Sequence, residues 1–102
     1  MMAIKVVIEF HAKPGARGEL KKVLESISVT HGPSAPGFLG STVYEALDSS
    51  DIVVEIAGWE TAEAQAAAVA AASAEGVYGP VLELVGAPIR ATRIGRPTGN
   101  QQ

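Results

Sequence analysis

The stretch IKVVIEFHA, residues 4–12, decides the fold of this chain. Its side chains alternate in character, and every second one is apolar (Ile4, Val6, Ile8, Phe10 and Ala12), which predicts a β-strand with one buried face. Lys13-Pro14-Gly15 ends this strand. The pattern that follows predicts an amphipathic helix over residues 16–30 and a second strand over residues 38–47. The first half of the chain is therefore expected to fold as strand, helix, strand.

The second half repeats this order. Residues 52–58 predict a third strand, and the alanine-rich residues 62–74 predict a second helix with Thr61 as its N-cap. A short further turn of helix over residues 80–85 and a last strand over residues 87–94 follow. The order β-α-β-β-α-β predicts a ferredoxin-like α+β fold, with a four-stranded antiparallel sheet and helices on one face.

The other face of such a sheet is left uncovered by the chain itself. Hydrophobic residues make up 47% of the 102 residues and charged residues 19%, which is apolar for a small monomer. We therefore expect a homodimer in which a second copy covers this face. The length predicts one domain over residues 1–94, with residues 95–102 as a flexible tail.

Composition excludes several classes of protein. The formal net charge is −3 and no basic block occurs, so we expect no nucleic-acid partner. The chain has no cysteine, which excludes disulfides and thiolate sites and is compatible with the cytoplasm, where we expect the protein. No apolar run approaches the roughly 20 residues of a membrane span, and the N-terminus does not have the pattern of a signal peptide.

Three short motifs resemble the antibiotic biosynthesis monooxygenase (ABM) domain family. They are Lys13-Pro14-Gly15, the opening Pro36-Gly37-Phe38-Leu39-Gly40 of the second strand, and Trp59-Glu60-Thr61 before the alanine helix. The resemblance covers residues 4–94. It implies a dimeric α+β barrel, in which the sheets of two subunits pair, and a pocket between each sheet and its helices. Some members oxygenate aromatic polyketides with molecular oxygen and without metal or flavin, and others degrade haem.

The resemblance also allows the hypothesis of haem degradation to be tested against the sequence. Haem-degrading relatives use an axial histidine on the second helix and an asparagine on the first strand. Here residues 62–74 contain no histidine, Ile8 stands where the asparagine is expected, and only the tryptophan, Trp59, is retained. His11 and His31 lack the spacing of metal ligands, and His31 is expected to be a loop residue. We therefore expect no metal and no cofactor.

Three residues are candidates for catalysis. Trp59 lies where the third strand meets the second helix; it either stacks on a flat ligand or, as we favour, plugs the core at this corner. His11 is a candidate base, although no partner carboxylate is fixed by spacing, and it otherwise is a half-exposed or interface residue. Arg90 is a candidate to stabilise a developing enolate or oxyanion.

Three further residues are candidates for binding a substrate. The hydroxyls of Tyr44 and Tyr78 would orient a phenol or quinone, unless either ring is simply part of the core. Glu55 is an acid within an apolar strand, so burial would require a partner or a raised pKa. We favour a cross-strand or cross-dimer ion pair, with Arg90 or Arg93 as the cation for Glu55 or Glu45.

These observations leave three hypotheses for function. The first is a cofactor-independent monooxygenase acting on a small aromatic or polyketide-like substrate, such as an anthrone or dihydroquinone. The alternative is a non-catalytic dimer that binds a small apolar molecule or assists a pathway, which the few polar groups and the alanine helix favour. An isomerase or cyclase of the same fold is the third. The small side chains of residues 62–74 predict that this helix lies very close to the sheet or leaves room beside it.

Overall fold

The computed structural model describes residues 3–96. Its elements, in chain order, are β1 (Ile4–His11), α1 (Arg17–His31), the 3-10 turn η1 (Gly32–Ser34), β2 (Phe38–Glu45), β3 (Ile52–Trp59), α2 (Ala62–Ala74), α3 (Gly79–Leu84) and β4 (Arg90–Ile94). This order confirms the α+β fold expected from the sequence, including the extra turn of helix. Most of the expected tail, residues 97–102, lies outside the described residues.

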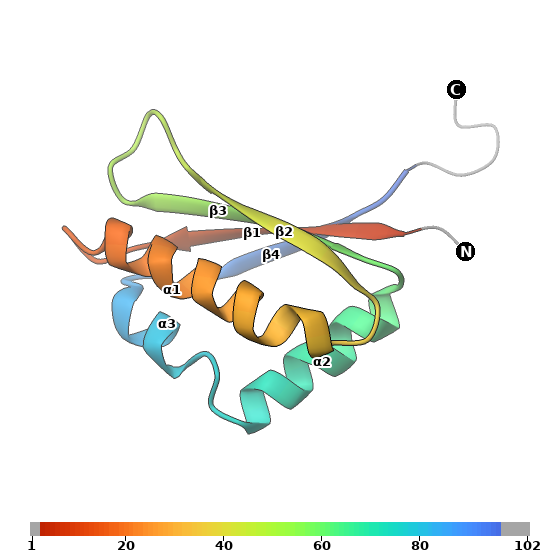
Figure 1. Cartoon of the computed structure of the whole chain (residues 1–102). Helices are drawn as coiled ribbons and strands as arrows, with labels where there is room; N and C mark the ends of the chain where they lie inside the picture. The colour runs from red at the N-terminus through yellow and green to blue at the C-terminus, as the bar shows by residue number, and fades with distance from the viewer. Residues whose placement is uncertain (1–2, 97–102) are drawn as a thin grey trace.

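The four strands form one antiparallel sheet in the order β2-β3-β1-β4. Figure 1 shows α1, α2 and α3 on the same side of this sheet. The register sets Phe10 opposite Val53 and Val6 opposite Ala57, so these residues share the face that the helices cover. We call this the helix face and the opposite one the far face. The alternation in residues 4–12 is confirmed, because Val6, Phe10 and Ala12 are all buried.

The core has two parts. Beneath α1 and α3, one cluster joins Phe10, Leu20, Leu24, Val53 and Val81, and Leu20 and Val53 have no solvent exposure. Val6, Ala57 and Trp59 form the second cluster, at the end of the sheet nearer α2. Helix α2 itself contributes no buried residue. Its short side chains leave room between helix and sheet.

Some boundaries differ from the expected ones. Helix α1 continues to His31, which was expected in a loop. The physical reason is that Gly32 keeps right-handed helical dihedral angles (φ −56°, ψ −50°) and passes directly into η1. Strand β4 begins at Arg90 rather than at residue 87, since Pro88 cannot donate a backbone hydrogen bond to a neighbouring strand.

Candidate functional site

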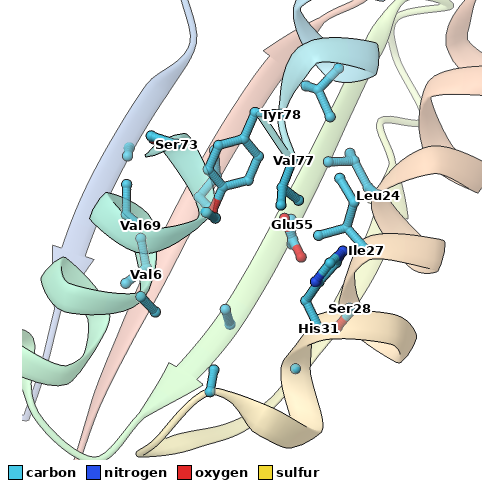
Figure 2. A pocket seen from close by; sticks show the side chains of 18 of the residues that line it. Val6, Leu24, Ile27, Ser28, His31, Glu55, Val69, Ser73, Val77 and Tyr78 are labelled. Atoms are coloured by element: carbon cyan, nitrogen blue, oxygen red, sulfur yellow. The ribbon is translucent and has the colours of Figure 1, made fainter. Parts of the chain in front are cut away.

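A cavity of about 580 Å³ lies between the helix face of the sheet and the helices. Figure 2 shows side chains from α1, from β3 and from the segment between α2 and α3 around it. Its lining is mostly apolar, and its volume is typical of small-molecule sites. Ala68 and Ala72 of α2 both line it. Larger residues at these positions would fill the space, so the alanine composition of α2 is what keeps the cavity open.

Two aromatic rings form one wall of the cavity. Trp59 and Phe38 meet edge to face, with their ring centroids 5.1 Å apart and their planes at 61°. Trp59 is 8% exposed, so it packs in the core, and it also lines the cavity. A Cβ atom at Gly32 would lie 2.5 Å from Cε2 of Phe38. The Phe38 ring therefore packs closely on Gly32 and also contacts Trp59.

The loop before β2 lies close to α2. Gly37 has φ +84°, and a Cβ atom there would lie 2.7 Å from that of Ala64. Thr61 caps α2, because its hydroxyl accepts a hydrogen bond of 2.9 Å from the backbone N–H of Ala64. These contacts fix the first turn of α2 beside the aromatic wall, while the rest of the helix borders the cavity.

A small polar group faces the cavity from the middle of the sheet. Glu55 lies on β3 between Ile8 of β1 and Val43 of β2. Burial raises the pKa of the Glu55 carboxyl above its ordinary value, and the nearby Ser41 hydroxyl opposes this rise. The Ser41 hydroxyl also lies 2.6 Å from that of Ser28 on α1. The Ser41 hydroxyl thus interacts with the carboxyl of Glu55 and also contacts Ser28.

Tyr78 and His31 complete this polar group. Tyr78 lies between α2 and α3; burial is the main cause that raises its pKa, and the charge of Glu55 adds to it. Its hydroxyl therefore keeps its proton at neutral pH and is a hydrogen-bond donor. His31, the last residue of α1, also lines the cavity. Figure 2 shows Glu55 on the sheet, facing the space between α1 and the segment with Val77 and Tyr78.

The structure thus brings together three of the six candidate residues, Trp59, Tyr78 and Glu55. His11, Arg90 and Tyr44 lie on the far face. Nε2 of His11 is 2.8 Å from Oε2 of Glu9, a carboxylate two residues away on the same face of β1. Arg90 is the register partner of Glu9 on β4. Tyr44 is 51% exposed.

The ion pair expected for Glu55 is not found among the described residues. Arg90 projects from the far face, and β1 separates β4 from β3. Arg93 is on the helix face, but its Nε donates a hydrogen bond of 2.9 Å to Oε1 of Gln65. Glu45 pairs instead with Arg17, with 3.6 Å between Nη2 and Oε1.

Sequence reasoning missed Ser28, His31 and Gln65 as lining residues. Ser28 and His31 continue the spacing of Leu24 and Ile27 along one face of α1, and this helical periodicity was a usable signal. Within residues 3–96 no three acidic or histidine side chains gather as a metal site. Over the same range, no helix is both long and apolar enough to cross a bilayer.

The sequence matches the model of the family described as antibiotic biosynthesis monooxygenase over residues 3–75. No curated protein matches it significantly. Among solved structures, SnoaB, a cofactor-independent oxygenase from Streptomyces nogalater, has 19% identity over 100% of both chains, with a TM-score of 0.79. A Bordetella bronchiseptica protein whose description names the same family has 13% identity over 96% of this chain and 100% of its own, with a TM-score of 0.84. A conserved protein from Methanosarcina mazei Go1 has 16% identity over 95% of each chain, with a TM-score of 0.80. At these identities the similarity shows the fold.

Proposed function

Because the chain belongs to the antibiotic biosynthesis monooxygenase family, we propose that it is a cofactor-independent monooxygenase of small aromatic substrates such as anthrones. The observation that carries this proposal is the apolar cavity of about 580 Å³ with Trp59 and Phe38 in its wall. A flat hydrophobic molecule gains both burial and ring contacts there.

The proposed reaction needs a substrate that is itself able to reduce oxygen. An anthrone loses a proton from its methylene carbon, and the resulting carbanion reduces O₂. A new C–O bond gives a peroxide, which loses water and leaves a ketone, so one methylene and one O₂ yield one carbonyl and one water. The protein contributes a dry cavity, and Tyr78, as a donor, would hold the enolate oxygen that develops when the proton leaves.

We assign Trp59, Tyr78 and Glu55 to contacts with the ligand. His11, Arg90 and Tyr44 are better placed for an interface, since they lie on the far face. Apolar side chains are also exposed on this face, including Leu39 (56%) and Ile94 (45%). We infer that a second copy of the chain covers it, as the composition predicts.

The test of the proposed function is oxygen consumption with dithranol (1,8-dihydroxyanthrone) in the absence of added metal or flavin. Ala72→Phe would place a ring in the cavity, whereas Ala71→Phe, one residue away, would place it at an exposed position outside the lining. We expect the first variant to lower oxygen consumption about tenfold or more and the second to retain it. Equal activity in both variants would show that oxidation takes place elsewhere.

A second candidate is a binding protein without catalysis. It is favoured by the small number of titratable side chains in the described lining, which are those of His31, Glu55 and Tyr78. Because Trp59 is the single tryptophan, its fluorescence reports occupancy of the cavity. Quenching by dithranol without oxygen consumption would support this second candidate.

A further inference from the structure

We propose that Glu55 is the proton acceptor for the bound ligand, so that the cavity takes neutral aromatic molecules with an acidic C–H or O–H and rejects carboxylated ones. The inference rests on the proposed function only for the identity of the substrate class. The removal of the proton can be measured without oxygen.

The position of Glu55 is the first argument. Among residues 3–96 it is the one carboxylate that lines the cavity, and the lining contains no lysine or arginine. The carboxyl is carried by a central strand, with apolar neighbours on both sides (Ile8 and Val43). A strand holds a side chain more rigidly than a loop does, so a ligand in the cavity meets this group in a fixed place.

The cost of its burial is the second argument. No ion pair offsets the charge of Glu55 within the described part of the chain, and burial accordingly raises the pKa of the carboxyl. A carboxyl with a raised pKa is a stronger base than an ordinary glutamate, and general bases work best when their pKa approaches the working pH. A half-buried acid without a neighbouring cation lowers the stability of the fold. Such groups with shifted pKa values are frequent at functional sites, where they accept or donate protons.

The other groups that face Glu55 fit the same role. Tyr78 and His31 are the titratable ones in the lining, and the Ser41 hydroxyl, which also contacts Ser28, interacts with the carboxyl. Tyr78 keeps its proton and would donate to the oxygen of the substrate while Glu55 takes the proton from carbon. Burial raises the pKa of Glu55, and the hydroxyl of Ser41 opposes part of this rise by favouring the ionised carboxyl, the form that accepts a proton.

The class of ligand follows from the charges. An anionic ligand group placed beside Glu55 would repel it, and the described lining offers no permanent cation to balance two negative charges. A neutral donor meets no such penalty. In the proposed step the C–H bond breaks, the proton forms a bond to an oxygen of Glu55, and the electron pair stays on the substrate as an enolate. The proton returns to carbon or, in the presence of O₂, to the peroxide.

The experiment is solvent exchange under anaerobic conditions. Dithranol is incubated with the protein in D₂O, and deuterium at its methylene carbon is followed by mass spectrometry. We expect the wild-type protein to speed the exchange above the buffer rate and Glu55→Gln to slow it about 100-fold. The matched control is Glu83→Gln, an exposed position on α3 outside the cavity, which should keep the wild-type rate.

The pH dependence of the wild-type protein provides a test that needs no variant. The charged form of Glu55 is the base, so the exchange rate should rise as the pH passes upward through its raised pKa and then level off. A rate without this rise, or Glu55→Gln exchanging as fast as Glu83→Gln, would overturn the proposal. Exchange without oxygen consumption in air would instead refute the proposed function and leave this inference standing.

Selectivity is measured by quenching of Trp59 with 1-naphthol and 1-naphthoate at neutral pH. We expect the wild-type protein to bind naphthol at least about tenfold more tightly, and Glu55→Gln to reduce this preference about tenfold by admitting the anion. Equal affinity of the wild-type protein for both probes would contradict the assigned ligand class.

Discussion

Replacing Gly32 by alanine should destabilise the protein through the aromatic wall of the cavity. The new methyl group would lie 2.5 Å from Cε2 and 2.9 Å from Cδ2 of Phe38. The backbone there is right-handed helical, so alanine causes no backbone strain. The ring also contacts Trp59 edge to face, so we expect its displacement by the new methyl group to disturb this aromatic contact.

The expected size follows from two opposing terms. Overpacking of this kind costs about 1–3 kcal/mol, and the loss of glycine flexibility in the unfolded chain returns about 0.4–1 kcal/mol. The midpoints of these two ranges give a net loss for Gly32→Ala of about 1.3 kcal/mol. Gly18→Ala is the matched control: it lies in α1 with no atom within 4 Å of the new methyl group, so it should gain up to about 1 kcal/mol.

The assay is urea unfolding followed by Trp59 fluorescence and, in parallel, by circular dichroism. Gly32→Ala should unfold at a lower urea concentration than Gly18→Ala, and its native emission should shift as Phe38 displaces Trp59. Equal midpoints for the two variants, with unchanged emission, would refute the reasoning and show that the Phe38 ring moves freely.

Three further predictions concern the cap, the buried acid and the far face. Thr61→Ala removes the cap of α2 and should lower the unfolding free energy by about 1 kcal/mol in urea titrations; wild-type stability would contradict this. Because the pKa of Glu55 is raised in the folded protein, its protonation contributes to the unfolding free energy. This contribution is fully present below the ordinary pKa of 4.5 and is lost as the pH rises through the raised value. Glu55→Gln should therefore melt above the wild-type protein at about pH 8 and lose this advantage at about pH 4, and a constant difference would rule out the linkage. Ile56→Lys adds a charge to the far face and should halve the mass found by light scattering; an unchanged dimer mass, or a monomeric wild-type protein, would refute the proposed interface.

The order of elements could be predicted from the sequence because it depends on local signals. The alternation in residues 4–12, the breaks at Pro14 and Gly37, and the Thr61 cap each act over a few residues. The end of α1 could not be predicted in the same way. Gly32 and Pro33 indicate a loop, but a 3-10 turn continues the helical path, and His31 thereby becomes a helix residue beside the cavity.

The composition of the site was harder to predict, because it depends on which face of the sheet each residue joins. The alternation in residues 4–12 already predicts His11 on the face opposite Phe10, whereas the face of Arg90 follows from its pairing with Glu9. Glu55 was noticed because an acid in an apolar strand is unusual. Its lack of a cation depends on strand order, which places β1 between β3 and β4, and this order is not visible in local sequence.

Because α2 buries no side chain against the sheet, its amide hydrogens should exchange faster than those of the sheet. The helix is held at its first turn by the Thr61 cap and further along by Gln65, which accepts a hydrogen bond from Arg93, while none of its side chains is buried. Its later amides, from residue 66 to residue 74, should therefore exchange by local opening, at a free energy well below that of global unfolding. The amides of β1 and β3 should exchange only when the whole domain unfolds. Helix α2, which forms one wall of the cavity, should thus be less protected from exchange than the sheet. We expect a bound ligand to be detected first as slower amide exchange in α2.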